Sequence, residues 1–276
     1  MYSLNCKGKL VVIDTAIVMG IINLTPDSFY AESRKHGPDE MLFTAEQMLK
    51  EGAVMLDLGG QSTRPGSERI SVEEELARVI APIEKLAQTF PEAIISIDTY
   101  YARVAKEAVQ AGAAVVNDIS GGMMDANMLD TVGHLQTPYV CTHILGEPAT
   151  MQQSPQYNDV VLEVLDYFIA KIKTCRDRGI RDLIIDPGFG FGKTIAHNFQ
   201  LLRELKTFTM LDVPILAGLS RKGTVYKTLG VEPEQALNGS TVLHTLALTN
   251  GASILRVHDV RAAVEAITLF RAYNEA

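Results

Sequence analysis

Acidic and amide side chains stand at the ends of three short apolar runs in the sequence. Asp98 follows the run at 94–97, Asn117 closes the run at 115–117, and Asp186 closes the run at 183–186. Any one of them alone could simply cap the turn into a following helix. Together they could hold the donor-rich edge of an amino-pyrimidine heterocycle, with about 1.5–3 kcal/mol from each charge-assisted hydrogen bond. The three positions therefore favour a binding site for a flat heterocyclic ligand.

Cationic side chains stand at the ends of other apolar runs. The set comprises Arg64, Lys222, Arg256 and His258. Arg64 and Arg256 could instead pair with neighbouring acids on the surface, but the separate run ends argue against that interpretation for the whole group. We expect the set to bind a small anion, either a phosphate or a diphosphate.

The glycine-rich stretch at 188–194 does not have the spacing of a nucleotide-binding loop. A P-loop needs four residues between its first Gly and its Gly-Lys pair, and that spacing is absent here. The glycines would let the chain fold back closely and place Phe189 or Phe191 against an aromatic ligand. A tight turn with core phenylalanines explains the pattern nearly as well. His143 has no second His or Cys at metal-ligand spacing, so zinc is not expected.

Eight apolar runs rich in Ile and Val carry these polar ends, and longer amphipathic stretches alternate with them. The runs occupy residues 17–22, 54–58, 94–97, 115–117, 138–141, 183–186, 213–218 and 254–257. Helical patterns occupy residues 39–51, 72–90, 102–111, 160–178, 234–250 and 260–273. Near-continuous apolar strands between helices imply a parallel sheet that is covered on both faces.

Eight such units in about 250 residues imply closure into a (β/α)8 TIM barrel of the α/β class. An open doubly wound sheet is the rival architecture, but it concentrates its site at one switch point. Polar residues end nearly every run here, and barrel sites are built at the carboxyl ends of all the strands. We expect one domain over residues 1–276, with an N-terminal β-hairpin at 2–14 that turns at 7–9 and closes the barrel bottom.

The amino-acid composition of the chain restricts which macromolecules it could bind. The 276-residue chain has 25 Lys and Arg against 33 Asp and Glu, and its formal net charge of −8 has the wrong sign for an extended nucleic-acid or anionic-membrane surface. No apolar run approaches the roughly 18 residues of a membrane span. The start has no apolar leader, and the three cysteines form no CxxC pair. We expect a cytoplasmic protein with neither nucleic-acid nor membrane partners.

Seven motifs, in order, make the sequence similar to the dihydropteroate synthase family, the pterin-binding barrel enzymes of folate biosynthesis that sulfonamides inhibit. The resemblance runs from about residue 17 to residue 259. It is carried by NLTPDSF (23–29), QSTRPG (61–66), SIDT (96–99), NDI (117–119), DPGFGFGK (186–193), SRK (220–222) and RVHD (256–259).

The resemblance implies a reaction, in which p-aminobenzoate joins hydroxymethyl-dihydropterin diphosphate to give dihydropteroate and free diphosphate. It implies a pterin pocket at Asp98, Asn117, Asp186 and Lys222. It implies diphosphate binding by Asn23, Arg64, Arg256 and His258, with Mg²⁺ at Asn23. It implies a p-aminobenzoate side at Thr63, Pro65, Phe191 and Ser220. The catalytic group would be Asp98, Asp186, Lys222 and Arg64, and the family is usually a homodimer joined through its later helices.

Carboxylates around the pterin ring and cations around the departing diphosphate favour an SN1-like path that needs no strong general base. We expect the segments 24–38 and 62–70 to act as lids.

The nearest rival function is that of a pterin barrel that transfers a methyl group from methyl-tetrahydrofolate to a corrinoid protein, a reaction that does not need the cations. A binding barrel without turnover is the second rival. Gln61, often Glu in the family, and Thr142, often Met, are departures that bear on substrate affinity.

Overall fold

Eight parallel strands form a ring in the computed structural model, which describes residues 1–24, 37–62, 67–147, 150–152 and 154–276, without the side chains of 37–39. The strands are β3 (Ile17–Asn23), β4 (Met55–Gly59), β5 (Ile94–Asp98), β6 (Val115–Asp118), β7 (Tyr139–Thr142), β8 (Leu183–Asp186), β9 (Leu216–Ala217) and β10 (Ile254–Val257). They pair in the order β8-β7-β6-β5-β4-β3-β10-β9. A parallel bridge between Ile185 and Ile215 joins the two outermost strands and closes the barrel. The predicted TIM barrel is confirmed.

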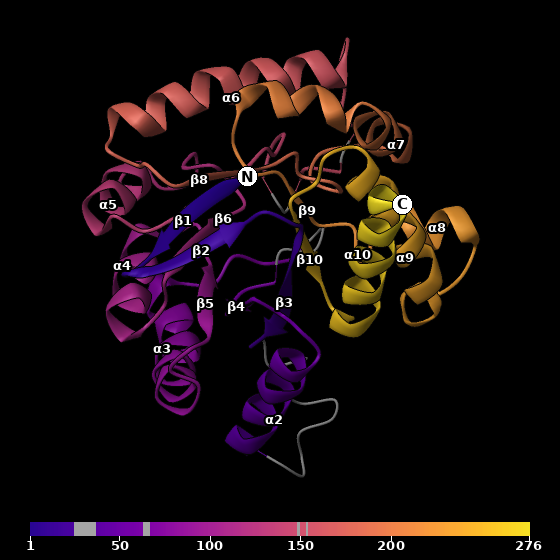
Figure 1. Cartoon of the computed structure of the whole chain (residues 1–276). Helices are drawn as coiled ribbons and strands as arrows, with labels where there is room; N and C mark the ends of the chain where they lie inside the picture. The colour runs from indigo at the N-terminus through magenta and orange to yellow at the C-terminus, as the bar shows by residue number, and fades with distance from the viewer. Residues whose placement is uncertain (25–36, 63–66, 148–149, 153) are drawn as a thin grey trace.

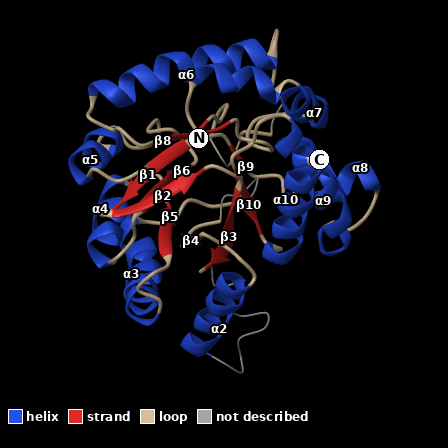
Figure 2. Ribbon diagram, in the orientation of Figure 1, coloured by secondary structure: helices blue, strands red, loops and turns tan. Residues whose placement is uncertain are grey.

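Helices surround this barrel on the outside (Figure 2). They are α2 (Gly37–Lys50), α3 (Val72–Thr89), α4 (Ala102–Ala111), α5 (Met128–Leu135), α6 (Val160–Asp177), α7 (Ile195–Arg203), α8 (Gly223–Leu229), α9 (Leu237–Thr249) and α10 (Val260–Glu275), with 3-10 turns η1 (Leu205–Leu211) and η2 (Pro233–Gln235). The short helices α5, α7 and α8 were not expected from the pattern. The predicted helix at 234–250 begins three residues later, because η2 occupies its first turn. No helix in the described part of the chain is long and apolar enough to cross a membrane.

The N-terminal hairpin lies across one end of the barrel (Figure 1). Its strands β1 (Tyr2–Cys6) and β2 (Lys9–Ile13) pair antiparallel around a two-residue turn. Lys7 and Gly8 both have positive φ, 53° and 87°, the pair of left-handed residues that a tight hairpin turn requires. Leu4, Cys6 and Ile13 pack against the inner residues of the barrel strands. The predicted N-terminal hairpin is present, and its buried side chains cover this end of the barrel interior.

Alternation along each strand divides the side chains into two sets. The outward set packs under the helices in the larger core, while the inward set packs with the hairpin in the smaller core. The inward set contains Met19, Met55, Ile94, Val115, Val140, Ile184, Leu216 and Ile254. Because successive side chains alternate, residues two or four positions further along each strand also point into the barrel, nearer its carboxyl end. The side chains of the candidate site occupy these positions.

Candidate active site at the carboxyl ends of the strands

Strand alternation brings the predicted site residues of several strands to one rim. Asn117, Asp186 and Arg256 each stand two residues beyond an inward core residue of their strands. Asp98 and Asn23 stand four residues beyond theirs. All five therefore face the same end of the barrel interior. Asp98, Asn117 and Asp186 are buried, while Asn23 is exposed.

Arg256 joins acidic groups from two neighbouring strands. Its Nε donates to Asp57 Oδ2 at 2.6 Å, and its Nη2 donates to Asp98 Oδ2 at 2.6 Å. Asn117 Nδ2 donates to the same Asp57 oxygen at 2.9 Å. Burial alone would lower the pKa of Arg256, but Asp57 and Asp98 hold it above its ordinary value. The guanidinium is a fixed cation within the acidic rim, and among the described residues its ion pairs are with these buried acids and not with surface ones.

Asp57 is the residue of this network that sequence reasoning missed. It is fully buried, and its Oδ1 has no hydrogen-bond partner among the described residues. The signal was present in the sequence, because a carboxylate at position 57 interrupts the apolar run at 54–58. A charged residue inside a strand that is covered on both faces needs a buried partner. Arg256 is that partner.

Asp98 has a pKa raised from 3.8 to about 7. Burial is the largest cause; Arg256 opposes it, and the charge of Asp57 adds to it. Burial also raises the pKa of Asp186, against the effect of Lys222. Burial lowers the pKa of Lys222 to about 8, with Asp186 opposing that shift. Asp98 and Lys222 therefore titrate close to neutral pH, a common property of active-site residues.

Asp186 and Lys222 meet around the glycine-rich turn that follows β8. Asp186 Oδ1 accepts a hydrogen bond from the amide of Gly188 at 2.8 Å. Lys222 Nζ donates to the carbonyl of Phe189 at 2.5 Å and lies 4.5 Å from the centre of the Phe191 ring. Phe189 is fully buried and Phe191 is 7% exposed, so both rings belong to the core as well as to the turn.

Ser220 and His258, which were assigned to different substrates, contact each other. Ser220 Oγ accepts from the amide of His258 at 3.2 Å and lies 3.1 Å from His258 Nδ1. The neighbouring Arg221 takes no part in the rim, because its Nε and Nη2 both donate to the carboxylate of Asp259 at 2.8 Å. The two predicted subsites are thus adjacent at the loops after β9 and β10.

Thr63, Arg64 and Pro65 lie outside the described residues, as does most of the expected lid at 24–38. The described ends of the second expected lid are tied to the barrel. Gln61 Oε1 accepts from the amide of Ile70 at 2.8 Å. Arg69 Nε donates to the hydroxyl of Tyr101 at 2.7 Å, and that hydroxyl donates to the carbonyl of Ile70. The side-chain amide of Gln61 therefore joins the two ends of that segment.

A second buried acid lies behind the rim and was also missed. Glu75, in the first turn of α3, is fully buried, and neither carboxylate oxygen has a hydrogen bond of good geometry among the described residues. Burial raises its pKa to about 8, which Thr99 opposes and the charge of Asp98 reinforces. Its position in a helical pattern gave no indication of burial, because three glutamates stand side by side there.

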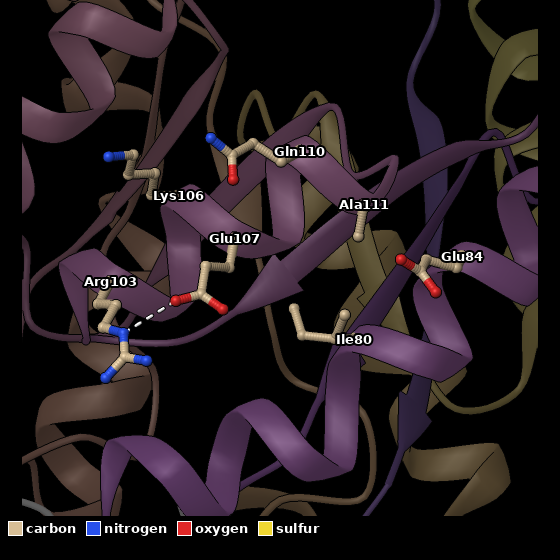
Figure 3. Close-up of a pocket in the computed structure, with 7 residues that line it drawn as sticks. All are labelled: Ile80, Glu84, Arg103, Lys106, Glu107, Gln110 and Ala111. Carbon is tan, nitrogen blue, oxygen red and sulfur yellow. Dashed lines mark hydrogen bonds and ion pairs between the residues drawn. The ribbon is translucent and has the colours of Figure 1, made fainter.

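A hollow on the outer surface is separate from this site. A cavity of about 570 Å³ lies between α3 and α4, and Figure 3 shows Arg103 paired with Glu107 at its wall. Its other lining residues are Ile80, Glu84, Lys106, Gln110 and Ala111. None of the rim residues lines it. Arg103 and Lys106 are offset by Glu84 and Glu107, so the cavity has no net charge to select a ligand.

Mg²⁺ binding at Asn23 is consistent with the residues that are present. Mg²⁺ takes hard oxygen ligands and usually keeps one or two from protein beside water and substrate phosphates. The described residues contain no group of three His, Cys, Asp or Glu that could hold a metal by themselves. Asn23 ends β3 with an exposed amide that no described residue binds, so an amide oxygen is available at the rim.

The fold and the rim define a TIM-barrel enzyme with an acidic pocket and adjacent cations at the carboxyl ends of its strands. The comparisons with known proteins agree. The family model described as pterin binding enzyme matches residues 19–258. A dihydropteroate synthase of Escherichia coli is 42% identical over 257 residues, covering 92% of this chain and 90% of the relative.

Two solved structures extend the comparison. The Xanthomonas albilineans dihydropteroate synthase with 4-aminobenzoic acid superimposes with a TM-score of 0.93 at 42% identity, over 99% of this chain and 98% of that one. The same enzyme in complex with 7,8-dihydropteroate gives a TM-score of 0.89 at 39% identity, over 100% of both chains. The chain belongs to the pterin-binding enzyme family and, within it, to the dihydropteroate synthases.

Proposed function

We propose that this chain condenses hydroxymethyl-dihydropterin diphosphate with p-aminobenzoate at the rim. The CH2–O bond of the pterin breaks, a C–N bond to the amine forms, the amine nitrogen gives up one proton to the departing diphosphate or to water, and dihydropteroate and diphosphate leave. The observation that carries the proposal is the arrangement of Asp98, Asn117, Asp186, Lys222 and Arg256 around one end of the barrel interior. A relative from Xanthomonas albilineans binds 4-aminobenzoic acid and another complex of it holds 7,8-dihydropteroate, which supports the same substrates here.

The charges of the rim suit a path that separates charge. Breaking the CH2–O bond leaves positive charge on carbon, which the electron-rich dihydropterin ring shares, and negative charge on the diphosphate. Asp98 and Asp186 favour the cation, while Arg256, with Arg64, favours the leaving group. Burial and the charge of Arg256 lower the pKa of His258 to about 4, so the expectation of a cation there is corrected: its neutral imidazole can offer the diphosphate a hydrogen bond but no charge. Because the amine then attacks an available cation, no strong general base is needed. An isotope effect that reports tight, nucleophile-dependent bond making would refute this SN1-like path.

Mg²⁺ would be held at Asn23 together with the diphosphate of the substrate. When bound, it neutralises charge on the phosphate oxygens. The amide oxygen of Asn23 would orient that end of the substrate toward the cations of the rim. Lys222 lies against Phe191 and near Asp186, a position that suits it to contact both the pterin and the p-aminobenzoate.

Diphosphate release in the presence and absence of p-aminobenzoate tests the function directly. Release that depends on p-aminobenzoate supports the proposal. Methyl transfer from methyl-tetrahydrofolate to a corrinoid protein, without diphosphate release, would support the methyltransferase instead. Binding of the pterin with no product would indicate a barrel that only binds.

We further propose a cytoplasmic homodimer that associates through the later helices. The support is a set of exposed apolar side chains on α8 and α9, namely Leu229, Leu237, Val242 and Leu246. Val242 and Leu246 are one turn apart on α9, so a single face presents both. Light scattering should give twice the chain mass for the wild type, and the double change Val242→Glu and Leu246→Glu should give a monomer.

A further inference from the structure

A buried lysine stands under the glycine-rich turn, and the mechanism above does not use it. Lys193 is 2% exposed, and its ammonium lies within hydrogen-bond distance of three backbone carbonyls. The distances are 3.2 Å to His143, 3.1 Å to Gly188 and 3.0 Å to Phe191. No carboxylate lies within ion-pair distance of it among the described residues.

Donor counting shows how this ammonium is used. A charged lysine has three N–H groups for four acceptors here, the three carbonyls and His143 Nδ1, and burial lowers the pKa of Lys193 to about 7. His143 Nδ1 also lies 2.9 Å from Lys193 Nζ, and the ring packs edge-on against Tyr167. Burial lowers the pKa of His143 to about 2, and the charge of Lys193 adds to the shift, so the imidazole is neutral. Lys193 thus ties the turn after β8 to the backbone that follows β7.

Two glycines let the turn after β8 pack closely against the segment that follows β7. Gly188 and Gly192 have φ of 72° and 62°. A Cβ at Gly188 would stand 1.9 Å from the carbonyl oxygen of His143, and one at Gly192 would stand 2.4 Å from that of Leu145. The turn therefore lies directly on the segment that follows β7, with Lys193 as the cross-link between them.

The other side of the same turn holds Lys222. Lys222 Nζ donates to the carbonyl of Phe189 and lies over the ring of Phe191. Phe191 is also the residue whose carbonyl Lys193 binds. The turn at 188–191 is consequently held between two lysines, one in the core and one at the rim.

We propose that Lys193 is a positioning residue, which holds the turn at 188–191 so that Phe189 and Phe191 fix the ammonium of Lys222 between the two substrates. The inference rests on the proposed role of Lys222. It adds a core residue, on the buried side of the turn, to the groups that set the rate. Lys193 acts only through Lys222 and the turn.

A double-mutant cycle tests this coupling. Lys193→Met, Lys222→Met and the double variant are compared by kcat and KM in the diphosphate-release assay. A displacement of about 1 Å at a reacting centre can cost about 100-fold, so Lys193→Met should lower kcat to a comparable extent. In the Lys222→Met background the same change should have almost no further effect, because the group it positions is gone. The KM for pterin diphosphate should stay close to wild type, since Asp98 and Asn117 are untouched.

Two controls separate positioning from general destabilisation. Lys206→Met removes an exposed lysine and should leave activity unchanged. Val164→Ala opens the core under α6 and lowers the melting temperature without touching the turn. If Lys193→Met does not fold, Lys193→Gln, which keeps two amide N–H donors, replaces it in the cycle.

If Lys193→Met lowers kcat by the same factor with and without Lys222, the proposal is overturned. It is also overturned if Lys193→Met lowers kcat no more than a Val164→Ala variant of matched stability does. An unchanged rate in Lys222→Met alone would also overturn it, because Lys193 would then have nothing to position. The proposed function fails separately, if the wild type releases no diphosphate with p-aminobenzoate.

Discussion

Asp57→Asn tests whether the buried carboxylate sets the geometry of the rim. The change keeps the shape of the side chain and removes its charge. Asp57 Oδ2 accepts from Arg256 Nε at 2.6 Å and from Asn117 Nδ2 at 2.9 Å, so both residues lose a charged acceptor. A hydrogen bond to a charged group contributes about 1.5–3 kcal/mol. At about 1.4 kcal/mol per tenfold, kcat/KM should fall about 10- to 100-fold.

The pH profile supplies a second measurement of the same change. The charge of Asp57 raises the pKa of Asp98, which lies at about 7 in the wild type. Removing that charge should lower the pKa of Asp98 and move the acid limb of the kcat/KM profile to lower pH. Diphosphate release is measured from pH 5 to 9, with Asp166→Asn on the exposed face of α6 as the matched control. A variant with wild-type kcat/KM and an unmoved acid limb would refute the reasoning.

Three further outcomes are expected. The pKa of Glu75 is raised to about 8, so the wild type should lose up to about 5 kcal/mol of unfolding free energy as pH rises from 4.5 to 8, and Glu75→Gln should not show this loss. Urea unfolding at pH 5 and 8.5 measures it, and an equal loss in the variant contradicts the prediction. Chelation with EDTA should abolish diphosphate release and excess Mg²⁺ should restore it, with Asn23→Ala needing more Mg²⁺; activity that survives chelation excludes the metal. Asp186→Ala should lose pterin binding in calorimetry, whereas Arg256→Ala should chiefly weaken pterin diphosphate relative to pterin; unchanged pterin affinity in the first variant removes Asp186 from the pocket.

The architecture was predictable because strand ends and strand alternation follow from local sequence. Each of the eight apolar runs overlaps one of the eight strands, with ends that differ by three residues at most, and the turn at Lys7 and Gly8 was visible in the N-terminal residues. Helices α5, α7 and α8 were not, because their seven to nine residues give too few turns for a periodic pattern. Their helical state depends on packing against the barrel more than on propensity.

The partners of the site residues were harder to predict than their positions. Asp98, Asn117 and Asp186 stand at the rim where strand ends placed them, but the bond from Arg256 to Asp57 joins residues 199 positions apart. No local pattern specifies such a pair. Lys193 gives the clearest case, since GFGFGK indicates a turn, while the three carbonyls that hold its lysine depend on how β7 and β8 lie together.

The ion pairs of Arg256 are compatible with its expected contact to a diphosphate. A guanidinium has five N–H groups in a rigid plane. Asp57 and Asp98 use one on Nε and one on Nη2, which leaves three, including both on Nη1, without a hydrogen-bond partner among the described residues. The carboxylates therefore fix the plane of the cation, while the N–H groups on its free edge can donate to phosphate oxygens. A donor set that is oriented before the substrate arrives does not have to reorganise during the reaction, which is the physical condition for electrostatic stabilisation of a departing anion. A lysine at this position could not divide its donors in the same way, because its ammonium is a single point at the end of a flexible chain.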